Sequence, residues 1–379
     1  MAATVLKEHA GAPSALPLDS FRVSGFRGLR DLRIPELGRV NLFVGMNNAG
    51  KSSLLEAIHL YAGGATPTPL QQLLTGREEI PPGNRSHVDP EVLDAALSRL
   101  FHADGPARGT HLTLGPIDVD ARELSIRRGW ATRLTAGESL SMRFSTAEPD
   151  DFLGETERAL EVRVGGSPAR VIPNHRVVKG FSLAAALQFL YPAMFVSPSG
   201  LSTEVVAFAW DRVSLTDEED LVTAALRIIA PEVERLSVIG DVDGPYERRV
   251  MVRLQGQSTP VPLRTMGDGM NRLLGIALAL AISRDGILLI DEVENGIHYS
   301  VQADVWRMIL NTAALLNVQV FATTHSWDCI RAFAAATSSA ENGGSMLYRL
   351  DTRIKGEVRA VRYTASDVAI AAEQQIEVR

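Results

Sequence analysis

A single segment, residues 45–52 (GMNNAGKS), constrains what this chain can fold into, because it fits the pattern G-x-x-x-x-G-K-[ST]. The mostly apolar residues 40–44 before it predict a buried strand, and residues 51–61 after it have the periodicity of an amphipathic helix. Glycines let successive backbone N–H groups point into one hollow, and the helix directs its positive N-terminal end there. A glycine-rich turn that fits the pattern by accident is the alternative, but it does not account for this strand and helix.

The loop therefore predicts a site for the triphosphate of ATP or GTP and for Mg²⁺. We expect Lys51 to reach the β- and γ-phosphates, and we expect the Ser52 hydroxyl to ligate the metal ion. The residues expected to contact the nucleotide in this segment are Gly45, Asn47, Asn48, Ala49, Gly50, Lys51, Ser52 and Ser53.

Two acids follow a second predicted strand. Residues 287–290 (ILLI) are apolar and end in Asp291 and Glu292. In open α/β sheets, ligands bind beyond the carboxyl ends of the strands. We expect Asp291 to hold Mg²⁺ and Glu292 to polarise the attacking water as a general base. An acidic turn after a buried strand is the common alternative, and the loop at residues 45–52 favours the metal site.

A histidine closes a third predicted strand. His325 follows Thr323 and Thr324 at the end of an apolar run, one strand–helix–strand unit after Asp291. A lone histidine is more often structural, but this position favours a residue that senses the γ-phosphate and orients the water. The expected catalytic residues are therefore Glu292, His325 and Lys51.

A second glycine-bearing segment opens a predicted helix at residues 268–283. Flexible backbone at a helix N-terminus can bind phosphate, and Asp268 is suited to capping while Asn271 would face the turn. A simple helix start is the alternative. We expect Gly267, Asp268 and Gly269 to contact the γ-phosphate of an ATP held by a partner subunit.

Strands and helices alternate through the last third of the chain, which predicts a doubly wound, mainly parallel sheet. Short alternating segments between residues 111 and 172 predict antiparallel strands, and residues 63–110 are rich in turn formers around one helix expected at 91–101. A helix is also expected at 183–191 and a hairpin near 347–361. The predicted fold class is α/β, with a mainly parallel core sheet, an antiparallel β subdomain and an inserted helical and irregular region. The predicted division is a flexible leader (1–18), a core (19–62 and 190–379) and an insertion (63–189).

Composition excludes several classes of protein. No apolar run reaches the 18 residues of a membrane-spanning helix, and no secretory signal follows the N-terminus. Cys329 is the only cysteine, so no internal disulfide can form and a cytoplasmic location is expected. The net charge of −7 gives no general attraction to nucleic acid.

A local basic segment could still bind DNA. Residues 162–203 contain no acid. They carry Arg163, Arg170, His175, Arg176 and Lys179. This segment is either a DNA or partner surface or an ordinary solvated face, and Arg22, Arg27 and Arg30 are a weaker candidate for DNA or nucleotide contact.

These segments together resemble the ABC-type ATPase class, within it the branch shared by SMC proteins, RecF and the overcoming-lysogenization-defect (OLD) family. Residues 21–29 look like the F-x-x-F-R/K entry of that branch. Residues 41–58 look like its N-x-x-x-G-x-N-x-x-G-K-S-x-x-L-E-A-I run. Residues 291–298 (DEVENGIH) closely resemble the D-E-P-E-N-G-L-H stretch of stand-alone ATPases related to the OLD family. The resemblance covers about residues 20–62 and 190–379.

The resemblance implies an ABC-type AAA/P-loop ATPase that forms a head-to-tail homodimer, or a higher oligomer, with ATP and Mg²⁺ between subunits. Lys51, Ser52, Asp291 and Glu292 would serve one face, and residues 267–269 the opposite subunit. The signature segment of this chain, residues 266–269 (MGDG), differs from the L-S-G-G-Q signature of transporters. Val293 replaces the proline that usually follows the two acids. The 54 residues after His325 (326–379) are too few for the TOPRIM nuclease domain of the OLD family, so a nuclease would be a separate chain.

The predicted function is an ATP-driven conformational switch that acts on a nuclease, an effector protein or DNA, in phage defence or DNA maintenance. The alternatives are a RecF-like repair and recombination ATPase, a regulatory module that binds ATP with little turnover, and a transporter subunit. Glu292 and His325 argue against low turnover, and the altered signature argues against transport.

Overall fold

The structure is a computed structural model that describes residues 16–81, 88–104, 107–136, 139–148, 155–178, 190–240, 248–338, 344–353 and 357–373. Most of the leader expected at residues 1–18, and most of the helix expected at 183–191, lie outside the described residues. Within the described part of the chain, every helix is too short or too polar to cross a lipid bilayer.

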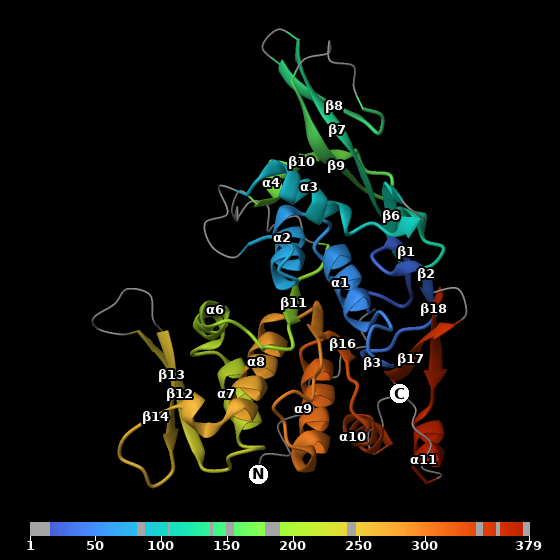
Figure 1. Cartoon of the computed structure of the whole chain (residues 1–379). Helices are drawn as coiled ribbons and strands as arrows, with labels where there is room; N and C mark the ends of the chain where they lie inside the picture. The colour runs from blue at the N-terminus through green and yellow to red at the C-terminus, as the bar shows by residue number, and fades with distance from the viewer. Residues whose placement is uncertain are drawn as a thin grey trace.

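The central sheet has the strand order β11-β15-β16-β3-β17-β18 (Figure 1). Its strands are β3 (Val40–Val44), β11 (Ala193–Val196), β15 (Ile287–Ile290), β16 (Gln319–Thr323), β17 (Ser345–Arg353) and β18 (Glu357–Tyr363). All pairs from β11 to β17 are parallel, and β18 returns antiparallel to β17. The predicted mainly parallel sheet is confirmed. The expected hairpin is β17–β18, and its first strand also extends the core sheet.

Alternate side chains of the central strands enter two separate hydrophobic cores. On β3, Leu42 and Val44 lie in one core and Phe43 in the other. On β16, Val320 lies in the first core and Phe321 in the second. Burial on both faces explains why these strands are apolar throughout, as parallel strands between helical layers are.

Different elements close the two cores. The first core is packed by α6 (Thr203–Val213), α7 (Asp217–Leu226), α8 (Asp268–Ile282), α9 (Gln302–Leu315), α10 (Trp327–Ser338) and α11 (Ala365–Glu373). The second is packed by α1 (Lys51–Ala62), α2 (Pro67–Gly76), α3 (Pro90–Ser98), α4 (Asn174–Val178) and an antiparallel sheet. A short 3₁₀ turn, η5 (Tyr299–Val301), precedes α9.

The antiparallel sheet has the order β10-β9-β7-β6-β1-β2, with β8 paired to β7. Its strands are β1 (Phe21–Phe26), β2 (Leu29–Ile34), β6 (His111–Gly115), β7 (Leu124–Ala136), β8 (Ser139–Ser145), β9 (Thr156–Val164) and β10 (Arg170–Pro173). The ends of β7, β8 and β9 project as an arm, at the top of Figure 1. The predicted antiparallel strands are therefore confirmed, and they form one sheet with β1 and β2.

Two smaller sheets complete the fold. One is formed by β12 (Val233–Gly240), β13 (Arg248–Leu254) and β14 (Val261–Pro262), and the other by β4 (Ala103–Asp104) and β5 (Ala107–Arg108). Short 3₁₀ turns lie at Asp120–Arg122 (η3) and Leu263–Met266 (η4).

The sequence did not predict α2, α4 or α6, and it extended another helix too far. Residues 67–76 were expected to be turns, yet they form α2, because Pro67 and Pro69 lie in the first helical turn, where proline is tolerated. The helix expected at residues 91–101 ends at Ser98.

Candidate nucleotide-binding site

Three of the expected site segments meet at one edge of the central sheet. β15, β16 and β3 are parallel neighbours, and their registers pair Ile290 with Ala322 and Thr323 with Phe43. The carboxyl ends of the three strands are therefore level. The loop after Val44, the acids after Ile290 and the turn after Thr323 all begin at this edge, which is where ligands bind in open α/β sheets.

The loop at residues 45–52 is shaped by residues in left-handed conformations. Gly45 has φ +148°, and a Cβ there would stand 2.6 Å from the Leu350 carbonyl oxygen of β17. Gly50 caps α1 at φ +93°, and Asn48 lies between them at φ +63°. A side chain at Gly45 would collide with β17, so the pattern's first glycine is required by packing as well as by conformation.

Lys51 folds over this loop. Its Nζ donates hydrogen bonds to the carbonyl oxygens of Gly45, at 2.7 Å, and Met46, at 2.9 Å. Burial lowers the pKa of Lys51, and the charges of Asp291, Glu292 and Glu294 act against that decrease. The ammonium group therefore lies in the electrostatic field of three acids that follow a different strand. Ser52 and Ser53 are half-buried in the first turn of α1.

Asp291 is held by the neighbouring strand. Its carboxylate is almost fully buried, and Oδ1 accepts a hydrogen bond from the Thr323 hydroxyl. The same hydroxyl oxygen accepts a hydrogen bond from the backbone N–H of Glu292, at 2.9 Å. Thr323 thus fixes both acids relative to β16, a role that the sequence did not reveal.

Glu292 is only half-buried and has an unusual backbone. Its φ is +49°, a left-handed value that is costly for a residue with a side chain. Asn295 Nδ2 donates a hydrogen bond to Oε2 at 2.8 Å, and His325 Nδ1 lies 3.7 Å from Oε1. The two catalytic candidates from separate strands are therefore neighbours.

His325 also meets a third acid, Glu294. The backbone N–H of His325 donates to Glu294 Oε1 at 3.2 Å, and Nδ1 lies 3.5 Å from the same oxygen. The Glu294 side chain is 8% exposed, and its second oxygen is buried with no hydrogen-bond partner among the described residues. The repeated acid in Asp-Glu-Val-Glu is the sequence signal that points to this residue.

The glycine-bearing segment before α8 lies beside the acids of its own chain. Gly267, with φ +98°, caps the helix, so Asp268 is its first helical residue and not the expected cap. Asn271 Nδ2 donates to the Gly267 carbonyl oxygen at 3.4 Å, facing the turn as expected. A Cβ on Gly269 would stand 2.7 Å from the Gly296 carbonyl oxygen, so this segment packs tightly on the loop that follows Glu292.

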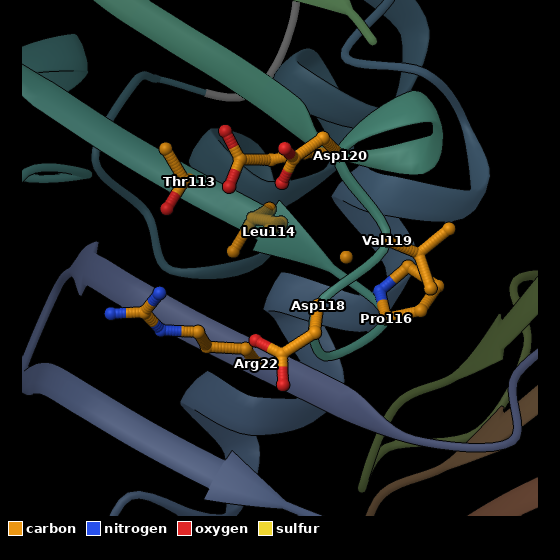
Figure 2. Close-up of a pocket in the computed structure, with 9 residues that line it drawn as sticks. Arg22, Thr113, Leu114, Pro116, Asp118, Val119 and Asp120 are labelled. Atoms are coloured by element: carbon orange, nitrogen blue, oxygen red, sulfur yellow. The ribbon is translucent and has the colours of Figure 1, made fainter.

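Arg22 and Arg27 are held by carboxylates of their own chain. Arg22 forms an ion pair with Asp31 at 2.8 Å, and it lines a polar hollow with Asp118 and Asp120 (Figure 2). Arg27 is buried against Glu56 and Glu79, at 2.7 Å from each.

The basic segment is also partly occupied by internal contacts. Arg170 donates to the Gly64 carbonyl oxygen at 2.5 Å, and His175 lies 2.6 Å from Glu157. Arg163 and Arg176 are exposed, and Lys179 lies outside the described residues.

The donors at the sheet edge suit a metal ion that is completed by phosphate. Among the described residues, no group of three or more histidine, cysteine, aspartate or glutamate side chains could hold a metal ion. Mg²⁺ needs only one or two protein oxygens when a phosphate supplies the others. The Ser52 hydroxyl and the Asp291 carboxylate, beside a loop with an inward lysine, fit that requirement.

Comparisons with known proteins agree with this geometry. The family model described as "AAA domain, putative AbiEii toxin, Type IV TA system" matches residues 40–328, from β3 to the start of α10. An ATP/GTP phosphatase of Helicobacter pylori is 24% identical over 342 residues, which cover 83% of this chain and 86% of that protein. An uncharacterised protein of Methanocaldococcus jannaschii is 36% identical over 83 residues, which cover 22% of this chain and 73% of that protein.

A solved structure has the same fold. The SMC head bound to the C-winged helix domain of ScpA has a TM-score of 0.51 and 14% sequence identity, over 92% of this chain and 98% of that chain. The chain therefore belongs to this AAA-domain family, and it is a P-loop ATPase with the ABC-type fold of SMC heads.

Proposed function

We propose that this ATPase binds Mg·ATP at the edge formed by β3, β15 and β16, and that hydrolysis takes place between two copies of the chain. The observation that carries the proposal is the meeting of Lys51, Asp291, Glu292 and His325 at that edge. Thr323 joins β16 to Asp291, and His325 Nδ1 lies 3.7 Å from Glu292. These groups come from three strands that are far apart in the sequence, so their convergence supports a shared chemical task.

Each residue has a role that follows from its chemistry. Lys51 and the N–H groups at the start of α1 would bind the phosphates, because positive charge and free N–H groups face the same hollow. Ser52 and Asp291 would hold Mg²⁺, which neutralises charge on phosphate oxygens when it is bound. Glu292 would accept a proton from the attacking water, and His325 would orient that water. Asn295 would keep the Glu292 carboxylate in place.

The second copy would complete the site with residues 267–269. These residues begin the 15-residue helix α8, and Gly267 and Asp268 are exposed. Within one chain Gly269 packs on Gly296, whereas a Cβ on Gly267 would meet no atom within 4 Å. The N-terminus of α8 is therefore available to phosphates held by another subunit. This supports a head-to-tail homodimer, as the ABC-type class implies.

Nucleotide state would be read by a partner. We propose a separate effector, such as a TOPRIM-type nuclease, or DNA, in a phage-defence or DNA-maintenance role close to the OLD and RecF branch. The solved SMC head was bound to a domain of ScpA, which supports a protein partner. We assign residues 19–62 and 190–379 to the ATPase core and 63–189 to an insertion. The arm of β7, β8 and β9 is the part of this insertion best placed to reach a partner.

The experiment that tests the proposal is titration calorimetry of Mg·ATP on the folded protein. We expect nucleotide uptake that is lost on removal of Mg²⁺ and weakened at least about tenfold in Lys51→Ala, because a buried phosphate contact is removed. Arg33→Ala, an exposed substitution on β2, is the control and keeps wild-type affinity. Absence of magnesium-dependent uptake, or normal uptake by Lys51→Ala, would refute the site.

Steady-state hydrolysis, measured with and without gapped DNA, separates the possible roles. A dimeric switch hydrolyses ATP, and its rate responds to the partner that it serves. Stimulation specific to gapped DNA would favour the RecF-like role. Binding without turnover would favour the regulatory module.

A further inference from the structure

Arg272 is a buried arginine that joins α8 to the two segments beside it. Its side chain is almost fully enclosed, at 5% exposure. Nη1 donates to the Ser197 carbonyl oxygen after β11, at 2.5 Å. Nη2 donates to the carbonyl oxygens of Asp291, at 2.6 Å, and Glu292, at 2.8 Å. One guanidinium group thus holds the backbone of Asp291, of Glu292 and of the segment that follows β11.

These contacts fall on either side of a strained residue. The carbonyls of Asp291 and Glu292 flank the Glu292 Cα, whose φ is +49°. A non-glycine residue keeps such a conformation only where its surroundings hold it. The Thr323 hydroxyl accepts a hydrogen bond from the Glu292 N–H. Arg272 donates hydrogen bonds to the carbonyl oxygens of Asp291 and Glu292. The direction of the Glu292 side chain therefore depends on Arg272.

Burial and charge both suit an arginine at this position. Burial lowers the pKa of Arg272 to about 10, and the charges of Glu294, Asp291 and Glu292 act against that decrease. The guanidinium group is therefore charged at neutral pH, yet the hydrogen bonds that it makes go to carbonyls. The planar fork of arginine offers two nitrogens to separate acceptors, which a lysine ammonium group does not reproduce.

Arg272 lies one turn after residues 267–269, on the helix that these residues open. A second contact fixes the same turn, because Gly269 packs against the Gly296 carbonyl oxygen. The start of α8 and residues 291–296 are therefore joined at two points. A shift of the start of α8 would carry Glu292 with it.

We infer that Arg272 is a positioning residue that sets the Glu292 carboxylate of its own chain from the helix carrying residues 267–269. The inference rests on the proposed function, in which those residues contact ATP held by a second copy. That contact would then be transmitted through Arg272 to the acid at the other nucleotide site of the dimer. The sequence reveals neither the positioning of Glu292 by Arg272 nor this transmission between sites, because there Arg272 is one charge in an apolar helix.

The test measures binding and turnover separately in the full chain. We expect Arg272→Met to lower kcat for ATP hydrolysis at least about tenfold, with KM and the calorimetric Kd for Mg·ATP changed less than about threefold. Arg284→Ala is the matched control, because Arg284 follows the far end of α8 and pairs with Glu218 at the surface. It keeps wild-type kcat. An unchanged kcat in Arg272→Met, or equal losses of binding and turnover, would overturn the inference.

A second variant covers the case in which Arg272→Met does not fold. Gly269→Ala displaces the same loop through the other contact, because its Cβ would meet the Gly296 oxygen at 2.7 Å. We expect the same fall in kcat with KM retained. Wild-type kcat in Gly269→Ala overturns the inference. Failure of the wild-type chain to hydrolyse ATP would instead refute the proposed function.

Mixed dimers show on which chain Arg272 acts. In a mixed dimer of Arg272→Met and Lys51→Ala chains, only the Arg272→Met chain has an intact nucleotide loop. The Glu292 at that site belongs to the same Arg272→Met chain, and residues 267–269 at that site come from the Lys51→Ala chain and are intact. We expect no recovery of hydrolysis. Asp268→Ala mixed with Lys51→Ala is the comparison, and it recovers activity because the intact signature comes from the second chain. Equal recovery of hydrolysis in both mixtures would show that Arg272 acts only through residues 267–269 of its chain, on the ATP held by the partner. That result would contradict the inference.

Discussion

The Thr323 hydroxyl donates a hydrogen bond to Asp291 Oδ1, and so connects the ends of β16 and β15 at the candidate nucleotide site. Both residues are buried, and the same hydroxyl accepts the N–H of Glu292. With Oδ1 engaged, Asp291 keeps its other oxygen for a metal ion. The order of strands in the sheet therefore decides how the carboxylate that we propose as a metal ligand is oriented.

Replacing Thr323 by valine keeps the shape of the side chain and removes this bond. The Glu292 N–H loses its partner, so we expect the free energy of unfolding to fall by about 1–3 kcal/mol. We also expect kcat for ATP hydrolysis to fall about tenfold, and the Mg²⁺ concentration for half-maximal activity to rise. Chemical denaturation and steady-state kinetics measure these effects. Thr337→Val, on α10, is the control. Unchanged magnesium dependence would contradict the role of Thr323.

Replacing Glu292 by glutamine removes the proposed base and keeps the acceptor for Asn295 Nδ2. We expect hydrolysis to fall at least about a hundredfold, because general-base catalysis contributes factors of that size. Binding of Mg·ATP is retained, so the ATP-bound dimer accumulates and is detected by light scattering after size-exclusion chromatography. Glu204→Gln, at the exposed start of α6, behaves as the wild type. Near-normal turnover in Glu292→Gln would rule out its role as the base.

A buried ion cluster supports the helix that follows the nucleotide loop. Arg27 on the β1–β2 turn contacts Glu56 of α1 and Glu79 after α2, and all three side chains are less than 12% exposed. Arg27→Ala leaves two buried carboxylates with less compensation, so we expect a loss of about 3–5 kcal/mol in the free energy of unfolding. Arg33→Ala, which removes an exposed pair with Asp31, costs under about 1 kcal/mol. Similar losses in the two variants would contradict the buried cluster.

The loss in Arg27→Ala depends on pH. Burial raises the pKa of Glu56, and Arg27 acts against that rise. Without Arg27 the pKa of the folded state rises further, so the folded variant binds a proton more tightly than the unfolded chain. In Arg27→Ala, the contribution of the Glu56 carboxyl to the free energy of unfolding is therefore present at low pH and is lost as pH rises. We expect the difference from the wild type to be smaller at pH 5 than at pH 7.

The single thiol reports on the packing beneath the site. Cys329 is 1% exposed on α10, and burial raises its pKa to about 12. At pH 8 about one thiol in ten thousand is ionised, against roughly a quarter for a free cysteine. We expect alkylation by iodoacetamide, followed by mass spectrometry, to be negligible in the folded protein and rapid in denaturant. Rapid alkylation without denaturant would show that α10 is not packed as described.

Local pattern predicted β3 and β15 of the central sheet, but it gave no strand at β11. The ranges expected for β3 and β15 agree with the structure, and α8 begins at the expected residue. These elements have long apolar runs or strong periodicity, which depend little on context. α2 was missed because its prolines were interpreted as turn formers, although the first turn of a helix needs no N–H donors.

The sequence by itself determined the phosphate loop, the positions of Asp291, Glu292 and His325 after strands, and the P-loop ATPase class to which they point, because each depends on residues close together in the chain. Only the tertiary structure decided that Thr323 holds Asp291, that Glu294 meets His325, and that Arg272 binds the backbone of both acids. Those contacts join residues that are 19 to 32 positions apart in the sequence. Their geometry depends on strand order and on burial of polar groups in a packed interior, which no local pattern records.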